Sequence, residues 1–237
     1  MRLKPLALRL TSAATALAAA EPALAQAAGG GSEVVRTALI LTLLAIVPAI
    51  LVSMTSFIRI VIVLSMVRHA FGMPETPPNA VLVSLTLFLT AFTMSPVLSE
   101  LNRDTVQPLL SGRMSVERAI ETGSEPLRKF MLTQTRDADI ESIYAISDTP
   151  LPERPEQVEI LKLAPAFILN ELRVAFTIGF VILLPFLLID LVVASILLSL
   201  GMMMVPPTTI SLPIKLLMFV LIDGWKLVLE GVLGSFG

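Results

Sequence analysis

Seven ionisable side chains stand inside or beside long apolar segments of this sequence, and they are the residues best placed to do chemistry. They are Arg59, Arg68, Glu171, Arg173, Asp190, Lys215 and Asp223. A charge at the centre of a membrane span costs about 2.5–3.5 kcal/mol on insertion scales, so each residue needs a partner or a task. A carboxylate at membrane depth can pass protons, so Asp190 or Glu171 would be the proton site of a secondary transporter.

A second chemistry open to these residues is proteolysis inside the membrane. Asp190 and Asp223 stand on neighbouring segments and would share a proton in the dyad of an intramembrane aspartyl protease. However, the flanking Ile-Asp-Leu and Ile-Asp-Gly sequences lack the Tyr-Asp and Gly-x-Gly-Asp pairs of those proteases. Asp223 can also pair with Lys226, three residues further along a helix. The sequence therefore disfavours a protease.

Other enzyme signatures are absent from the sequence. It contains no H-E-x-x-H, G-x-S-x-G or G-x-x-x-x-G-K-[ST] motif. With one histidine, His69, and no cysteine, the chain offers no thiolate metal site and no thiol nucleophile. We therefore predict a protein that is not an enzyme and that has no metal ion or other cofactor.

Structural ion pairing is the favoured explanation for the charges. Glu171 and Arg173 are two residues apart and point to different faces of a helix, so at least one needs a partner on another segment or subunit. Asp190 and Lys215 lie in adjacent apolar segments, and we expect them to face each other. Paired charges are the least costly way to keep ions in a helical bundle.

The segment Gly201–Pro207 carries three consecutive methionines, Met202, Met203 and Met204, between a glycine and a Pro-Pro pair. Glycine and proline mark it as a turn between two apolar segments. Methionine is apolar, unbranched and adaptable, and hydrophobic constrictions can gate pores. The turn would either seal a pore built from several subunits or dip into lipid as an ordinary apolar turn. Chemistry alone does not separate the two.

The composition of the chain is typical of a membrane protein. Of 237 residues, 55% are hydrophobic and 15% charged, whereas soluble domains carry about 25% charged residues. The mean hydropathy is +0.85. A net charge of −2 argues against a nucleic-acid partner, which would require a basic surface.

Four apolar segments must position the charges, and proline or charged residues interrupt several of them. About 20 apolar residues cross a bilayer core of about 30 Å. Broken or charged spans are tolerated where protein surrounds them. We therefore predict an all-α membrane protein of kinked helical hairpins. The segments are 34–57 with apolar sequence continuing to 67, 79–98, 174–200 and 209–222.

A polar insert separates the two pairs of apolar segments. Residues 99–159 hold 12 of the chain's 19 acidic residues and 7 of its 17 basic residues. Its spacing predicts helices, with Gly123 ending a first helix, Ser124 starting a second and Asp137 starting a third. The positive-inside rule places Arg59 and Arg68 on the cytoplasmic side and the insert in the periplasm.

The N-terminus is typical of a secretory signal peptide. Basic residues, an Ala-rich apolar stretch and an A-x-A site predict cleavage between Ala25 and Gln26. The alternative is a weak, uncleaved first span. The predicted divisions are the signal peptide (1–25), an N-terminal membrane hairpin (26–98), a periplasmic helical insert (99–160) and a C-terminal membrane hairpin with the Met-rich turn (161–237).

Several ordered motifs resemble the FliP/SctR family of type III export-gate subunits. In the first half they are TSFIR (55–59), PPNAVL (77–82) and MSP (94–96). In the second half they are PAF (165–167), NEL (170–172), GMMMVPP (201–207), ISLPIK (210–215) and DGW (223–225). The resemblance covers nearly everything from Val34 onward. The signal peptide favours the flagellar branch over the related injectisome subunit.

This resemblance implies a passive, gated conduit for unfolded export substrates in the flagellar basal body of the inner membrane. Family members assemble as about five copies with FliQ-like and FliR-like subunits into a helical oligomeric pore, in contact with lipid, other basal-body proteins and exported polypeptides. Apolar segments then need not span the membrane fully. By matching position, Met202, Met203 and Met204 take the family's role of a gasket in the pore. The alternatives are the equivalent injectisome subunit or a proton-coupled transporter.

Overall fold

The computed structural model describes residues 31–73 and 75–237, and every regular element in that part of the chain is a helix. The predicted signal peptide, with its cleavage between Ala25 and Gln26, lies outside the described residues. The chain divides into two compact units, residues 1–47 and residues 48–237. Helix α2 (Gly31–Ser53) leads from the first unit into the second, and it is the only element that the structure describes in the first.

Helix α9 (Ile160–Ser199) is long and apolar enough to cross a membrane. At 1.5 Å per residue, its 40 residues extend about 60 Å, roughly twice the thickness of a bilayer core. Two bent helix pairs also qualify if each counts as one span: Val47–Ser53 with Phe57–Ala70, bent by 65°, and Asn79–Thr93 with Ser95–Leu110, bent by 68°. These features confirm the predicted all-α membrane class.

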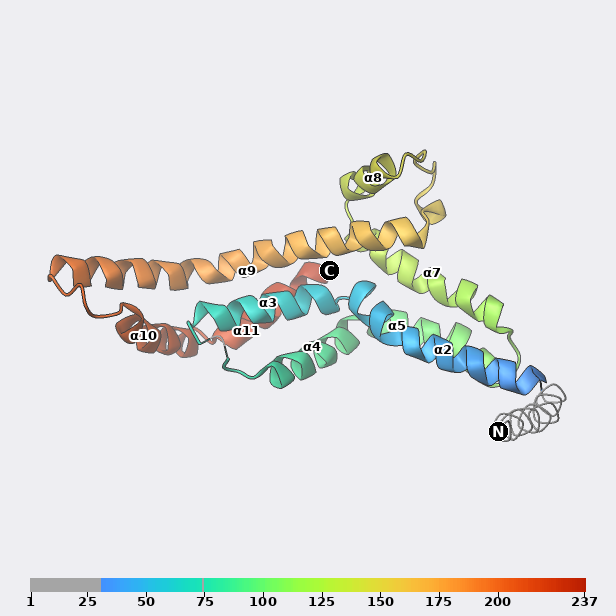
Figure 1. Cartoon of the computed structure of the whole chain (residues 1–237), viewed down its shortest axis with the longest axis horizontal. Helices are drawn as coiled ribbons and strands as arrows, with labels where there is room; N and C mark the ends of the chain where they lie inside the picture. Colours follow the sequence, from blue (N-terminus) through green and yellow to red (C-terminus); the bar gives the residue numbers. More distant parts are fainter. Residues whose placement is uncertain (1–30, 74) are drawn as a thin grey trace, which may run out of the picture. The chain divides into compact units, whose positions relative to one another are not determined.

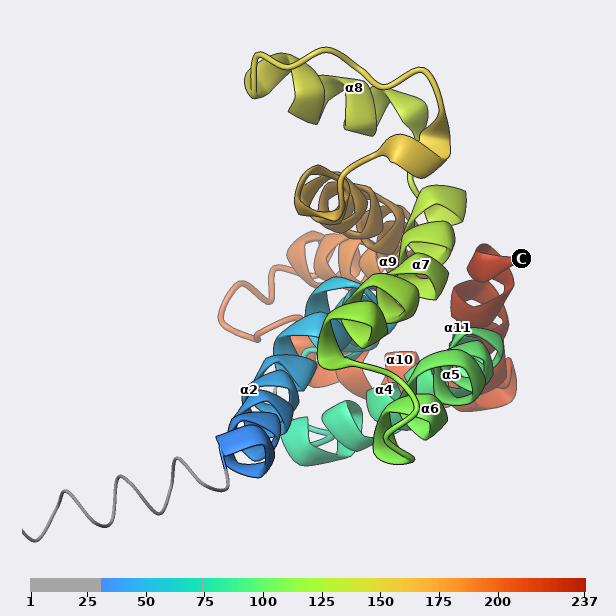
Figure 2. The ribbon, with the colours of Figure 1, turned by 90° about the vertical axis from the view of Figure 1, so that its right-hand side faces the viewer.

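The helices of the second unit are arranged around α9 (Figure 1). They are α3 (Phe57–Ala70), α4 (Asn79–Thr93), α5 (Ser95–Leu101), α6 (Gln107–Leu110), α7 (Val116–Gln134), α8 (Asp137–Ile146), α10 (Thr208–Leu221) and α11 (Gly224–Leu233). Helix α3 runs along α9, with α4 and α11 packed on α3 and α10 packed on α9. Helices α7 and α8 pack against the beginning of α9, and in Figure 2 α8 lies across it.

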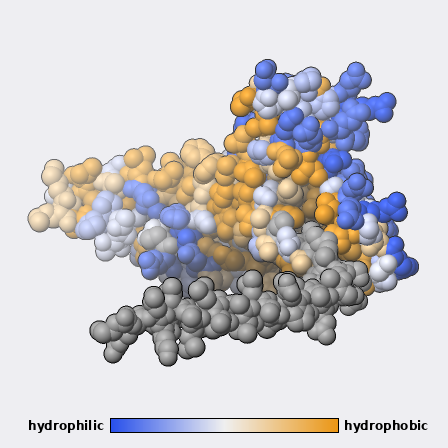
Figure 3. All heavy atoms as spheres, turned by 45° about the vertical axis from the view of Figure 1, so that its right-hand side comes forward, coloured by the Kyte–Doolittle hydropathy of each residue, from blue (hydrophilic) through white to orange (hydrophobic). Residues whose placement is uncertain are grey.

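Two separate cores hold the second unit together. The larger joins α3, α4, α9, α10 and α11, and Ile60, Val63 and Val228 are at most 1% exposed in it. The smaller core lies in the polar insert, where Met131, Ile140 and Tyr144 close over the first turns of α9. Helix α9 therefore anchors both. Hydrophilic residues gather on the lobe that carries α8, whereas hydrophobic residues cover most of the arm formed by α9 (Figure 3).

The third apolar segment was predicted over 174–200 with interruptions at Pro185 and Asp190, whereas the helix begins earlier and is not interrupted. One continuous helix starts at Ile160 and runs through Pro165 and Pro185. Each proline removes one backbone hydrogen bond. Phe167 and Phe186, which follow these prolines, are 0% and 2% exposed, so their tertiary packing offsets the local loss.

The sharp bends lie between α2 and α3 and between α4 and α5, and a hydrogen bond links the two bends. Helix α2 ends at Ser53 and α3 begins at Phe57, while α4 and α5 meet at Met94. Hydroxyl side chains compete with helical backbone bonding at such points, and Ser53 Oγ donates to Ala49 O at 2.6 Å. Ser56 Oγ lies 2.5 Å from Thr93 Oγ1, and Ser56 is fully buried. The two bends are therefore tied together by a hydroxyl pair in which Ser56 is buried and Thr93 is partly buried.

Helix α7 also corrects the prediction, because Gly123 does not end a helix. The helix runs unbroken from Val116 to Gln134, through Gly123 and Pro126, and Ser115 caps it. A Cβ at Gly123 would lie 3.2 Å from Thr105 Cγ2 and 3.3 Å from a Leu101 methyl group. Glycine here permits close approach of α7 to the preceding helical segment.

The turn between α10 and α11 is built on Asp223 and Gly224. Asp223 adopts the left-handed conformation with φ of 53°. Gly224 lies against the ring of Phe219, which makes edge-to-face contacts with Phe71 at 4.8 Å and Trp225 at 5.4 Å between centroids. A Cβ at Gly224 would lie 2.1 Å from Phe219 Cδ2. No side chain fits here unless the aromatic cluster moves.

We expect the Gly224→Ala substitution to destabilise the protein by about 1–3 kcal/mol through overpacking. This corresponds to a melting temperature lower by roughly 2–12 °C for a chain of this size, measured in detergent by fluorescence of Trp225. Gly234→Ala is the matched control, because no neighbour lies within 4 Å of its Cβ position and its φ of −63° suits alanine. An equal loss in both variants would contradict the steric explanation.

Candidate functional site: buried ion pairs and the methionine turn

Arg59 and Glu171 form a buried ion pair between α3 and α9. Their exposed fractions are 1% and 0%. Arg59 Nε donates to Glu171 Oε2 at 2.8 Å, and Arg59 Nη2 donates to Glu171 Oε1. The two parallel bonds match the planar fork of the guanidinium to a carboxylate. This pair therefore links α3 to α9, the two helices of the second unit that pack most extensively against each other.

The other donors of Arg59 reach distant parts of the chain. Arg59 Nη1 donates to Ser235 O at 2.7 Å and to Ser235 Oγ at 2.9 Å. Arg59 Nη2 also donates to Gln134 Oε1 at 3.1 Å. The Phe236 ring centroid lies 3.8 Å from Arg59 Cζ, a cation–π contact. All five N–H donors of the guanidinium therefore have acceptors, as a buried charge requires.

Gln134 extends this cluster into the insert. It is the last residue of α7, its Nε2 donates to Phe236 O at 3.3 Å, and its backbone carbonyl accepts from Asn170 Nδ2 at 2.5 Å. We refer to Arg59, Glu171, Gln134, Ser235 and Phe236 as the Arg59 cluster. It joins α3, α7, α9 and the segment after α11. The sequence did not reveal Gln134, Ser235 or Phe236, because no local spacing links them to Arg59.

Lys215 occupies a second buried ionic site. Its Nζ lies 2.5 Å from Asp190 Oδ2 and donates to Ala70 O at 3.0 Å. The structure thus brings together the two residues expected to face each other. Ala70 is the last residue of α3, so the ammonium also meets the negative end of that helix dipole. Lys215 is 5% exposed, whereas the Asp190 side chain is 38% exposed.

Glu171 and Arg173 diverge, as their spacing requires. Arg173 Nη1 donates to Asp139 Oδ2 on α8 at 2.7 Å, and Arg136 Nε donates to the same oxygen at 3.2 Å. Arg68 bonds to neutral groups, the side chain of Asn79 and the carbonyl of Pro77.

The predicted local pairing of Asp223 with Lys226 was wrong. Lys226 Nζ lies 3.9 Å from Glu230 Oε1 on the next turn instead. Asp223 precedes the first residue of α11 in the left-handed conformation, which redirects its side chain away from the helical spacing. A protease dyad needs two aspartates that share a proton. Asp190 instead forms an ion pair with Lys215.

The described residues contain no group of three or more His, Asp or Glu placed to hold a metal ion. The ionic sites bind their own chain, and their geometry is that of structural pairing. Large apolar side chains, by contrast, are exposed on several helices.

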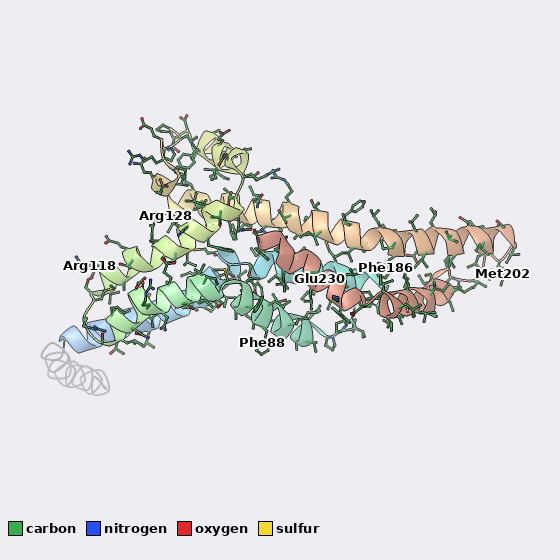
Figure 4. All side chains as sticks on the ribbon, turned by 180° about the vertical axis from the view of Figure 1, so that it is seen from behind. Phe88, Arg118, Arg128, Phe186, Met202 and Glu230 are labelled. Atoms are coloured by element: carbon green, nitrogen blue, oxygen red, sulfur yellow. The ribbon has the colours of Figure 1, made fainter. Side chains whose placement is uncertain are left out.

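The methionine turn is the most exposed apolar feature. Gly201 adopts φ of 75°, which glycine tolerates, and this conformation reverses the chain after α9. Met202, Met203 and Met204 are 44%, 81% and 97% exposed. Figure 4 shows Met202 at the far end of α9, beyond the packed core. The turn therefore presents the side chains of Met203 and Met204 with little support from their own chain, whereas Met202 is about half covered.

Known proteins match this chain over most of its length. The model of the FliP family matches residues 40–232. The flagellar biosynthetic protein FliP of Pectobacterium carotovorum subsp. carotovorum is 53% identical over 85% of this chain and 78% of its own length. The protein of the same name from Bacillus subtilis (strain 168) is 45% identical over 86% and 93%. That from Buchnera aphidicola subsp. Baizongia pistaciae is 48% identical over 85% of this chain but 56% of its own length.

Proposed function

Because this chain belongs to the FliP family, we propose that it is a pore-forming, non-enzymatic subunit of the flagellar type III protein export gate in the bacterial inner membrane. The methionine turn is the observation that carries the proposal, since Met203 and Met204 are 81% and 97% exposed. Such a turn, repeated by several copies around one axis, would close a pore with soft side chains that yield to a passing polypeptide.

The distribution of charge and apolar surface supports assembly into an oligomer. The buried charges are paired within the chain, while large apolar side chains such as Phe88, Phe92 and Phe180 are 55–77% exposed. Figure 4 shows Phe88 on α4, away from the core. Lipid and partner subunits would cover these faces. The oligomer would contain about five copies of this chain together with FliQ-like and FliR-like subunits. The insert 99–160 would lie in the periplasm, and the signal peptide would be removed before Gln26.

The native mass of the detergent-extracted complex tests this proposal. The chain would be co-expressed with the neighbouring FliQ-like and FliR-like subunits. We expect one large assembly that contains several copies of the chain, with an N-terminus at Gln26. A lone monomer with an intact N-terminus would overturn both the assembly and the cleavage.

The Asp190→Asn substitution separates a gate subunit from a proton-coupled transporter. Removing the carboxylate charge leaves buried Lys215 with a weaker partner, at an expected cost of about 1–3 kcal/mol. In a gate subunit the yield of assembled complex falls, and the Asp190→Asn/Lys215→Met double variant recovers part of it. Normal assembly with loss of proton-coupled flux would instead identify a transporter. Normal assembly and normal export would show that the ion pair between Asp190 and Lys215 is not needed for assembly.

A further inference from the structure

An open groove of about 550 Å³ lies on the surface between α9 and α3. It is lined by Met66, Arg173, Phe176, Thr177, Phe180 and Val181. None of these residues belongs to the Arg59 cluster, the Lys215 site or the methionine turn. All but Arg173 present apolar or methyl-bearing side chains.

The floor of the groove depends on a glycine. Gly179 on α9 is buried, and a Cβ there would lie 2.3 Å from Met66 Sδ. The missing side chain lets the Met66 thioether lie directly against α9. Thr177 Oγ1 donates to Arg173 O at 2.9 Å, so its hydroxyl is satisfied within the helix. Apart from Arg173, the lining therefore has no unsatisfied polar group, and an apolar chain suits it.

One end of the groove is positively charged. The Arg173 side chain is 46% exposed and uses Nη1 on Asp139. No described residue accepts a hydrogen bond from its Nε or Nη2. Arg136 shares the same Asp139 oxygen, so two guanidinium groups meet one carboxylate and leave one net positive charge.

Two further carboxylates of α8 lie outside the lining of the groove. Asp137 and Glu141 line a different pocket in the insert, together with Leu151 and Pro155. Arginine with free N–H donors binds phosphate well, because its planar fork matches the phosphate oxygens.

The position of the groove fits an amphiphile with one charged end. The ion pair between Arg173 and Asp139 joins α9 to the polar insert, and Arg173 therefore lies beside the insert. From there the groove follows α9 to Val181, which is 8 residues or about 12 Å along the helix. Phe176 and Phe180 are 56% and 55% exposed along this stretch. The charge therefore lies at the edge of the apolar surface, the level at which a lipid headgroup meets its acyl chains.

We propose that this groove binds an anionic phospholipid, with its phosphate on Arg173 and one acyl chain over Met66, Phe176 and Phe180. The charge selects an anionic headgroup, and the apolar walls select a long chain. The bound lipid would extend the apolar surface of α9 beside the insert. This inference requires the membrane class of the protein and is independent of any role in export.

Native mass spectrometry of the full chain, extracted in detergent with its co-purifying subunits, tests the proposal. Phosphatidylglycerol and phosphatidylcholine with identical acyl chains would be added in turn, and the retained adducts counted. We expect phosphatidylglycerol to be retained at least several-fold better. Arg173→Gln should weaken its retention about ten-fold, the loss of a charge-assisted contact. Val181→Trp should also weaken it by filling the groove without changing charge.

The Arg113→Gln variant is the matched control, since it removes one arginine charge from the insert at a residue that bonds to Ser111 and does not line the groove. It should retain the lipid. Equal retention of the two lipids, or retention unchanged in Arg173→Gln, would overturn the proposal. Loss of the oligomer in Val181→Trp, with lipid retention unchanged in what remains, would assign the groove to a second copy of the chain.

A measurement on the unaltered protein guards against misfolded variants. Phosphatidylglycerol with a photoreactive group in one acyl chain would be cross-linked and the modified peptides identified. Labels at Met66, Phe176 or Phe180 support the proposal, and labels confined to other helices contradict it.

Discussion

Replacing Glu171 with alanine is expected to destabilise the protein by about 3–5 kcal/mol, because it leaves the buried guanidinium of Arg59 without its carboxylate. Arg59 is 1% exposed, so water cannot replace the lost partner. For a chain of this size the melting temperature in detergent should fall by roughly 6–20 °C. We also expect the yield of assembled complex to drop.

Two comparisons make this result interpretable. The Arg59→Met/Glu171→Leu double variant removes both charges and should recover part of the loss, since apolar pairs often replace buried ion pairs without large cost. Glu125→Ala breaks the pair with Arg128, whose side chains are 58% and 25% exposed, and should cost less than about 1 kcal/mol. If Glu171→Ala were no more harmful than Glu125→Ala, the pair would not support the fold.

Replacing Met202, Met203 and Met204 together with alanine should leave the assembled complex intact but make membranes that contain it leaky to small solutes. The three side chains are exposed on their own chain, so their removal costs little folding stability. In the proposed pore they fill the central opening, and alanine is too short to do so. The measurement is uptake of an otherwise impermeant solute by cells expressing the gate subunits.

A leucine triple variant at the same positions is the control, because it keeps apolar bulk and changes mainly flexibility. It should remain much tighter than the alanine variant. If the alanine variant assembles correctly and the membrane still excludes the solute, the methionine turn does not seal the pore. An equally large leak in both variants would indicate that the adaptable thioether chain matters more than volume.

Apolar segments and their helical character could be predicted from the sequence, but the limits of the helices could not. Gly123 and Pro126 disfavour a helix locally, yet α7 passes through both because Gly123 lets it pack closely against Thr105. Helix α9 likewise passes through Pro165 and Pro185. In each case tertiary packing outweighs a local preference of about 1–3 kcal/mol.

The charged residues of the candidate site were also identifiable, whereas only some of their partners were. Asp190 and Lys215 lie in consecutive apolar segments, so topology alone suggested their contact. Glu171 lies 112 residues from Arg59, and nothing in the local pattern links the two. Asp139 is one of many acidic residues in a polar insert, and only the packing of α8 on α9 selects it for Arg173.

The Arg59 cluster also sets an order in time. Arg59 leaves the ribosome 176 residues before Ser235, which accepts two of its hydrogen bonds. At about 5–20 residues per second, translation separates the two by roughly 9–35 s. Throughout that interval the guanidinium enters its apolar surroundings with its acceptors incomplete. Closure of the bundle around Arg59 therefore waits until Ser235 has been made, and a nascent chain halted before Ser235 should remain open to proteases at α3.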